Sequence, residues 1–230
     1  MSDPVLTDDR EVPSPADAPP EPARPVPPRQ MVHVDAGSVL IVALLAVILA
    51  WAAYLRFVGQ NWDDFTHLHP DERFLTGVVS SLTPVANLGE YFDTHVSGLN
   101  PNNRGAGFYV YGTLPLFVVK AASGITADLT GDPVWTGYNG AHLVGRSVSA
   151  VADMLTLFFL FLLGRRLYGR WVGLLAAALY AGAVLPVQLS HFWTTDAFTS
   201  LPVVIALWFA VRAMDEGRWL DYGGFGVALG

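Results

Sequence analysis

An adjacent pair of carboxylates is the first feature of this chain that could do chemistry. Asp71 and Glu72 follow Pro70 in the segment His-Leu-His-Pro-Asp-Glu-Arg-Phe, residues 67–74. A positioned carboxylate can take a proton from a hydroxyl group, so the pair predicts a general base. Proline and acidic side chains are also favoured in the first turn of an ordinary helix. These residues alone leave both interpretations open.

Two histidines, His67 and His69, stand beside this pair. Imidazole and carboxylate groups together can bind a divalent cation, which makes such an ion a candidate cofactor. Exposed loop histidines are the alternative, and the sequence favours it, so the metal-binding residues stay unknown. A second polar group, His191 and Asp196, lies far along the chain, in the segment Ser-His-Phe-Trp-Thr-Thr-Asp.

The composition indicates that a lipid bilayer surrounds most of the chain. Of its 230 residues 52% are hydrophobic and only 14% are charged, whereas soluble domains have about 25% charged residues. The net charge of -7 argues against nucleic acid as a partner. With no cysteine, disulfides, thiolate metal sites and a cysteine nucleophile are excluded.

Apolar segments predict an all-α, polytopic membrane bundle with juxtamembrane helices in a long first outer loop. Residues 1–35 contain nine of the sixteen prolines and few large apolar side chains, which predicts a disordered cytoplasmic tail. A short helix is expected over 71–82, with Phe74, Val78 and Leu82 on a face along the membrane surface. The predicted spans are 36–58, 143–164, 171–189 and 198–214, with the start of a further span at 222–230.

Three arginines in the turn 165–170 set the predicted orientation. Such a turn favours the cytoplasm, which requires that the apolar segment 108–123 does not span. We therefore expect 108–123 to be a juxtamembrane or re-entrant helix. The outer loops are then 59–141 and 190–197. This topology places Asp71 and Asp196 on the same, extracytoplasmic side.

Several motifs, taken in order, resemble the GT-C superfamily of integral-membrane glycosyltransferases. The nearest group is family 39, which includes the protein O-mannosyltransferases and the aminoarabinose transferases. The resemblance runs from about residue 37 to the end of the chain, and because family members are longer we expect this to be the N-terminal portion of such an enzyme. The motifs are Pro-Asp-Glu-Arg-Phe (70–74), Tyr-Gly-Thr-Leu-Pro-Leu-Phe (111–117), Gly-Arg-Ser-Val-Ser (145–149) with Gly-Arg-Arg-Leu-Tyr-Gly-Arg (164–170), and Ser-His-Phe-Trp-Thr-Thr-Asp (190–196).

The resemblance implies a polyprenyl-phosphate sugar donor and an acceptor hydroxyl on a protein, lipid or glycan. Asp71 matches the general base of an inverting transfer, and Glu72 would orient Asp71, the acceptor or a cation. Asp196 matches the second acid, which binds acceptor, donor or metal. Tyr111, in the second motif, is expected to bind substrate. The implied location is the plasma membrane, with several passes and a cytoplasmic N-terminus.

Two positions depart from the family pattern. His191 stands where the O-mannosyltransferases have arginine, and Leu114 stands where the aminoarabinose transferases have lysine. His191 would bind a phosphate only when protonated. Phosphate recognition is therefore expected to involve another cation, and the candidates are Arg73, Arg104 and Arg146.

Two other classes of function remain as alternatives. A transporter or permease module would need broken helices near the membrane midplane or a repeated half. The sequence shows no internal repeat, and its acids lie in loops, apart from Asp153 inside a predicted span. Such an intramembrane acid faces protein or a polar cavity. A non-catalytic membrane scaffold is the other alternative.

Overall fold

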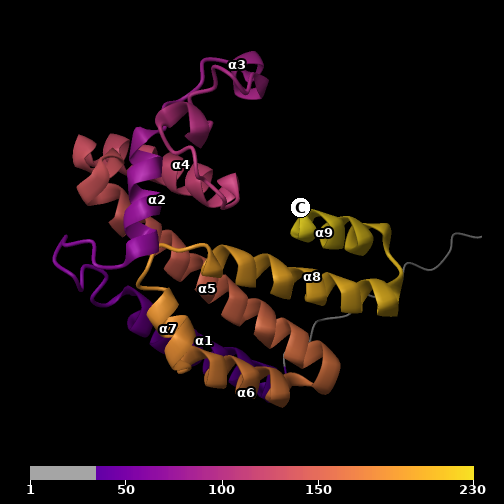
Figure 1. Cartoon of the computed structure of the whole chain (residues 1–230). Helices are drawn as coiled ribbons and strands as arrows, with labels where there is room; N and C mark the ends of the chain where they lie inside the picture. The colour runs from indigo at the N-terminus through magenta and orange to yellow at the C-terminus, as the bar shows by residue number, and fades with distance from the viewer. Residues whose placement is uncertain (1–34) are drawn as a thin grey trace, which may run out of the picture. The chain divides into compact units, whose positions relative to one another are not determined.

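The computed structural model describes residues 35–230, whose regular elements are all helical (Figure 1). The predicted tail lies outside the described residues, apart from Asp35. In chain order the α-helices are α1 (Ala36–Phe57), α2 (Pro70–Ser81), α3 (Leu88–Phe92), α4 (Thr113–Thr130), α5 (Tyr138–Tyr168), α6 (Arg170–Ala181), α7 (Val184–Leu189), α8 (Asp196–Glu216) and α9 (Trp219–Leu229). Two 3₁₀ helices, η2 (Pro101–Arg104) and η3 (Pro133–Thr136), lie in the loop segments.

Three of these helices, α1, α5 and α8, are long and apolar enough to cross a membrane. The 22 residues of α1 extend for about 33 Å, close to the thickness of the hydrocarbon core. Its large side chains are mostly exposed, among them Val39, Val42 and Val47. A helix this apolar on an exposed face suits a lipid environment. The predicted all-α helical membrane bundle is therefore confirmed.

The predicted third span, residues 171–189, is not one continuous helix. It is divided into α6 and α7, which are separated by Gly182 and Ala183. Pro186 favours the break, because in a continuous helix it would lack its hydrogen bond to Gly182 and its ring would clash with that carbonyl. The chain ends α6 at Ala181 and starts a new helix in which Pro186 falls in the first turn.

Of the apolar segment 108–123, expected to be one helix, only residues 113–123 are helical; they lie in α4, which begins at Thr113 and continues to Thr130. It is not among the helices long and apolar enough to span. α4 packs against both α2 and α5. Its placement beside the membrane rather than across it stays a prediction.

The helix expected over 71–82 is α2, but its apolar face does not lie free along a membrane surface. Val78 and Leu82 are buried in a core cluster with Leu116 of α4 and Trp193, and only Phe74 remains exposed. The expectation was wrong because α4 and α5 cover this face. As a result, α2 is packed into the rest of the fold.

Ion pairs connect the termini of several helices on one side of the bundle. Arg166 near the end of α5 contacts Asp215 at 2.9 Å and Glu216 at 2.6 Å, both in the last turn of α8. Arg170, the first residue of α6, lies 3.6 Å from Asp35 at the start of α1. The arginine-rich turn and the beginning of α1 therefore lie together. Which compartment this end faces stays a prediction.

Candidate functional site

Arg146 of α5 is the centre of a buried polar network. Its guanidinium donates to both carboxylate oxygens of Glu72, at 2.7 and 2.6 Å. It donates to both carboxylate oxygens of Asp63, at 3.0 and 2.9 Å, and to the carbonyl oxygen of Gln60 at 2.6 Å. A guanidinium has five N–H donors, and all five are used here. Arg146 therefore has no donor left for a phosphate group.

The first turn of α2 places Glu72 in this network. Pro70 begins the helix, and the Nδ1 atom of His69 accepts a hydrogen bond of 3.4 Å from the backbone N–H of Glu72. A proline at this position and acids in the first turn both stabilise a helix start. Because Glu72 is fully buried and Asp71 is exposed, the two neighbouring carboxylates face different surroundings.

Trp193 closes the network from a third segment of the chain. Its backbone N–H donates to Oε1 of Glu72 at 2.9 Å, and its side chain is completely buried. Trp193 packs directly on Gly145, where an added Cβ would lie 2.4 Å from the Cγ of the indole. Gly145 thus packs against Trp193, and the next residue, Arg146, binds Glu72.

The charges of the network do not balance, because two carboxylates share one guanidinium. Burial by itself raises the pKa of Asp63, but the hydrogen bonds and the positive charge of Arg146 outweigh this effect and hold the pKa below its ordinary value. The Trp62 ring covers the guanidinium carbon at 5.4 Å from the ring centroid. These contacts favour the ionised form of Asp63.

Asp71 and Asp196 are both exposed, and each lies in the first turn of a helix. Asp196 begins α8 and accepts a hydrogen bond of 2.7 Å from the hydroxyl of Thr194. The contact between Glu72 and Trp193 brings the start of α2 next to the loop that leads into α8, as Figure 1 shows. The structure therefore brings together the two segments that carry the predicted acids.

His191 is less available for binding a substrate than its position in the motif suggested. Its Nδ1 lies 2.8 Å from the carbonyl oxygen of Val187, and its Nε2 lies 2.9 Å from the carbonyl oxygen of Val58. Both ring nitrogens thus contact the main chain. The side chain ties the loop after α7 to the end of α1, and its expected role in substrate binding stays a prediction.

Tyr111 belongs to an aromatic group on the same side of α2 as Phe74. The ring centroids of Tyr111 and Phe74 are 6.3 Å apart, and those of Tyr111 and Tyr109 are 5.9 Å apart. Burial, with a smaller effect of Tyr111, raises the pKa of Tyr109 to about 12. The neutral phenol of Tyr109 donates to the carbonyl oxygen of Gly112 at 2.9 Å.

The residues proposed as metal ligands are not arranged as a metal centre. In the described part of the chain, no group of three or more histidine, aspartate or glutamate side chains is placed to hold a metal ion. His69 accepts from the backbone of α2, and Glu72 is bound to Arg146. His67 is buried, not exposed, and its Nε2 lies 3.3 Å from Oδ1 of Asn139, so three of the four candidate ligands are already engaged.

A second buried ion pair was not foreseen. Nε of Arg56, in the last turn of α1, donates to Asp153 of α5, and the hydroxyl of Tyr180 donates to the other oxygen of this carboxylate at 2.5 Å. Arg56 also donates to the carbonyl oxygens of Tyr180 and Ala181, at 3.4 and 3.0 Å. The cation therefore satisfies carbonyl groups at the end of α6, where the helix is broken. The sequence signal was Asp153 itself, since an acid within a span requires a partner.

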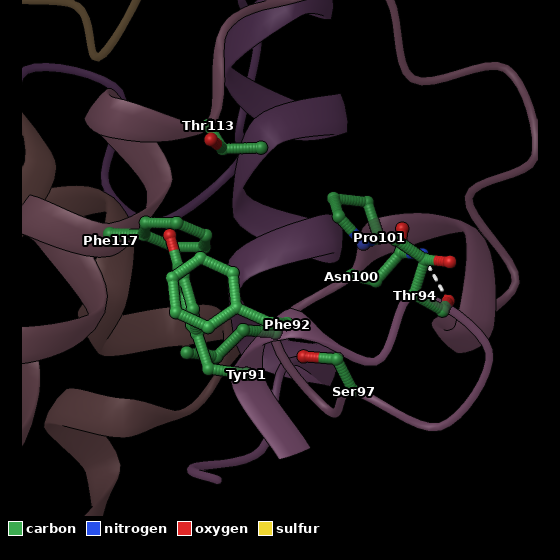
Figure 2. Close-up of a pocket in the computed structure, with 9 residues that line it drawn as sticks. Tyr91, Phe92, Thr94, Ser97, Asn100, Pro101, Thr113 and Phe117 are labelled. Carbon is green, nitrogen blue, oxygen red and sulfur yellow. Dashed lines mark hydrogen bonds between the residues drawn. The ribbon is translucent and has the colours of Figure 1, made fainter. Parts of the chain in front are cut away.

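A pocket of about 390 Å³ lies among α3, η2 and α4 (Figure 2). The side-chain amide of Asn100 donates to the carbonyl oxygen of Thr94 at 2.8 Å on one wall. None of the lining residues is charged, so this pocket offers neither a general base nor a cation for phosphate. Its other walls include three aromatic rings, those of Tyr91, Phe92 and Phe117.

Comparison with known proteins finds a similarity in the C-terminal part of the chain. A family model described as dolichyl-phosphate-mannose-protein mannosyltransferase matches residues 138–230. No curated protein and no solved structure gives a significant match. The matched segment starts with α5, so it contains Arg146 and Trp193 but not their shared partner Glu72. The match confirms that this chain resembles the membrane glycosyltransferases of the GT-C superfamily.

Proposed function

We propose that this protein transfers a sugar from a polyprenyl-phosphate-linked donor to an acceptor hydroxyl, with inversion at the anomeric carbon. One observation carries the proposal: Glu72 is held at once by Arg146 and by the backbone of Trp193. Both of these residues belong to the segment that matches the mannosyltransferase family. The contact joins the unmatched Pro-Asp-Glu segment to the matched one.

The proposed general base is Asp71. Its exposed carboxylate takes the proton of the acceptor hydroxyl while the oxygen attacks the anomeric carbon of the donor sugar. The bond from that carbon to the phosphate oxygen breaks, and the lipid phosphate leaves with the electron pair. A phosphate is a good leaving group, so the step needs one positioned base and little acid assistance.

The neighbouring residues have different roles in this proposal. Glu72 is a positioning residue, because its carboxylate is buried against Arg146 and cannot reach a substrate proton. Asp196 is exposed at the start of α8 and would bind the acceptor, the donor or a divalent cation. We place the site at the extracytoplasmic face of the plasma membrane, opposite the arginine-rich turn.

The transporter alternative receives less support from the contacts. A carrier would use the ends of a broken helix to bind its cargo, and α6 and α7 form such a break. However, the carbonyl oxygens of Tyr180 and Ala181 at this break accept hydrogen bonds from Arg56. The broken end is therefore engaged within the protein.

A transfer assay on the full-length protein tests the proposal. Membranes containing the wild type or Asp71→Asn are incubated with a labelled polyprenyl-phosphate mannose, and label in the acceptor fraction is measured. Loss of a general base predicts a rate lower by about 100-fold or more. Asp64→Asn is the matched control, since Asp64 is an exposed aspartate in the segment that leads into α2. Equal transfer by Asp71→Asn and wild type would remove Asp71 from the mechanism.

A further inference from the structure

Two arginines line a hollow between α2 and η2. The pocket has a volume of about 370 Å³, with Arg73, Gly77 and Ser81 on its α2 side and Arg104, Gly105 and Ala106 on the other. No acidic residue lines it. In a chain with a net charge of -7, a pocket with only positive charge stands out.

The guanidinium of Arg104 is held by the backbone of Gly98 and the side chain of Thr83. Its Nε donates to the carbonyl oxygen of Gly98 at 3.4 Å, and its Nη2 donates to the hydroxyl of Thr83. The backbone N–H of Thr83 donates to the same Gly98 carbonyl at 3.0 Å. A Cβ on Gly98 would lie 2.2 Å from the Thr83 hydroxyl oxygen and 2.8 Å from Nη2 of Arg104. Only glycine permits this close approach, so Arg104 is preorganised.

Neither arginine forms an ion pair with any other residue of the described chain. Six of the other arginines in this part do so, whereas Arg73, Arg104 and Arg165 do not. Nη1 of Arg104 also makes no hydrogen bond to a residue in 35–230. Donors of both side chains are thus available at the pocket.

The floor of the pocket is open at Gly77. A Cβ added there would meet no atom within 4 Å. Arg73, Gly77 and Ser81 follow one another at spacings of four residues, so they lie on one stripe of α2. A ligand in the pocket could therefore rest against this stripe, with both arginines lining the same pocket.

We propose that this pocket binds a phosphate group. Guanidinium groups bind phosphate through paired N–H donors, and a fixed arginine loses little conformational freedom on binding. Arg146 cannot supply this contact because its five donors are used within the protein. The phosphate could belong to a lipid headgroup or to a soluble molecule. The inference deepens the proposed function and rests on it in so far as the phosphate is that of the sugar donor, but phosphate binding can be measured without sugar transfer.

Binding of inorganic pyrophosphate tests the site directly. The full chain is placed in nanodiscs of phosphatidylcholine, and retention of labelled pyrophosphate is measured by equilibrium dialysis at low ionic strength. The double variant Arg73→Gln/Arg104→Gln should bind at least about tenfold more weakly than the wild type. Arg165→Gln is the matched control, because Arg165 is another exposed arginine without an ion pair in the described chain.

A second variant distinguishes binding inside the pocket from general attraction by positive surface charge. Gly77→Leu keeps both arginines but fills the open floor, so it should also weaken pyrophosphate binding. Equal binding by wild type and the double variant would overturn the proposal, as would an equal loss in Arg165→Gln. If Gly77→Leu retained full binding while the double variant lost it, the arginines would act as surface charges only, and the pocket would be rejected.

The source of the phosphate is tested by changing the lipid. Phosphatidylglycerol in the nanodisc should weaken pyrophosphate binding to the wild type if a lipid headgroup enters the pocket. Unchanged binding assigns the pocket to a soluble phosphate compound. Either result supports the site, provided that the double variant does not bind.

Discussion

Arg146 and Glu72 are joined by two hydrogen bonds of 2.7 and 2.6 Å, although 74 residues separate them in the chain. Both side chains are completely buried. Asp63 accepts two further hydrogen bonds from the same guanidinium. Because Asp71 directly precedes Glu72, the orientation of the proposed base depends on this arginine. The buried guanidinium of Arg146 thus helps to set the position of the exposed Asp71 carboxylate.

Removal of Arg146 should destabilise the protein strongly. Arg146→Gln leaves Asp63 and Glu72 buried without a countercharge, and loss of one partner of a buried ion pair costs about 3–5 kcal/mol. The thermal unfolding midpoint in detergent should fall well below that of the wild type. Arg165→Gln, at an exposed arginine, should leave the midpoint almost unchanged. Equal midpoints for the two variants would contradict the structural role of Arg146.

The contribution of Asp63 to stability should depend on pH. Its pKa is lower in the folded protein than in the unfolded chain, since the hydrogen bonds to Arg146 favour the carboxylate. A depressed pKa stabilises the fold above the unfolded value, and this stabilisation is lost as the pH falls below about 4. The free energy of unfolding should be measured against pH for wild type and Asp63→Asn. Their difference should be large at neutral pH and shrink in acid; a difference that grew in acid would contradict the assignment.

Sequence patterns predicted the helices where one local signal was dominant. The long apolar runs placed α1 and α8 within two residues of their observed ends, and Pro70 with two acids marked the start of α2. The division between α6 and α7 was missed, although Gly182 and Pro186 were visible in the sequence. The apolar neighbours of these two residues gave the segment a high mean hydropathy. Hydropathy does not reflect that Pro186 lacks a backbone N–H donor.

The candidate site could be predicted only in part, because pairing between distant residues leaves no local trace. Asp71, Glu72 and Asp196 stood out as acids in loops, but nothing near Asp63 marked it as a partner of Arg146. The sequence predicted that Arg146 could bind a phosphate, whereas its donors are all used inside the protein. Arg56 lay at the end of an apolar run, and only the fold brings it to Asp153.

The pair Arg56–Asp153 should matter far more to stability than the hydroxyl that accompanies it. Asp153→Asn removes the countercharge of the fully buried Arg56 and should cost about 3–5 kcal/mol. Tyr180→Phe removes one hydrogen bond to a charged group and should cost about 1–3 kcal/mol. Thermal unfolding in detergent ranks the two variants, with Tyr168→Phe, at an exposed tyrosine, as the control. A larger loss in Tyr180→Phe than in Asp153→Asn would reverse the expected order.

A single added methyl group should disturb the site through Trp193. In Gly145→Ala the new Cβ would lie 2.4 Å from Cγ of the indole, closer than the two atoms can approach. Trp193 must shift, and its backbone hydrogen bond to Glu72 would lengthen or break. Overpacking of this kind costs about 1–3 kcal/mol. Transfer activity should fall as well, because the start of α2 loses one of its two anchors.

Gly124→Ala in α4 is the matched control, since a Cβ there meets nothing within 4 Å. Alanine has a higher helix propensity than glycine, so this variant should gain up to about 1 kcal/mol. Unfolding midpoints and transfer rates are measured for both variants beside the wild type. The same Gly→Ala substitution is thus expected to destabilise the protein at position 145 and to stabilise it at position 124. The difference comes from the contact with Trp193. If Gly145→Ala were as stable and active as Gly124→Ala, the contact between Trp193 and Glu72 would not be what holds α2 in place.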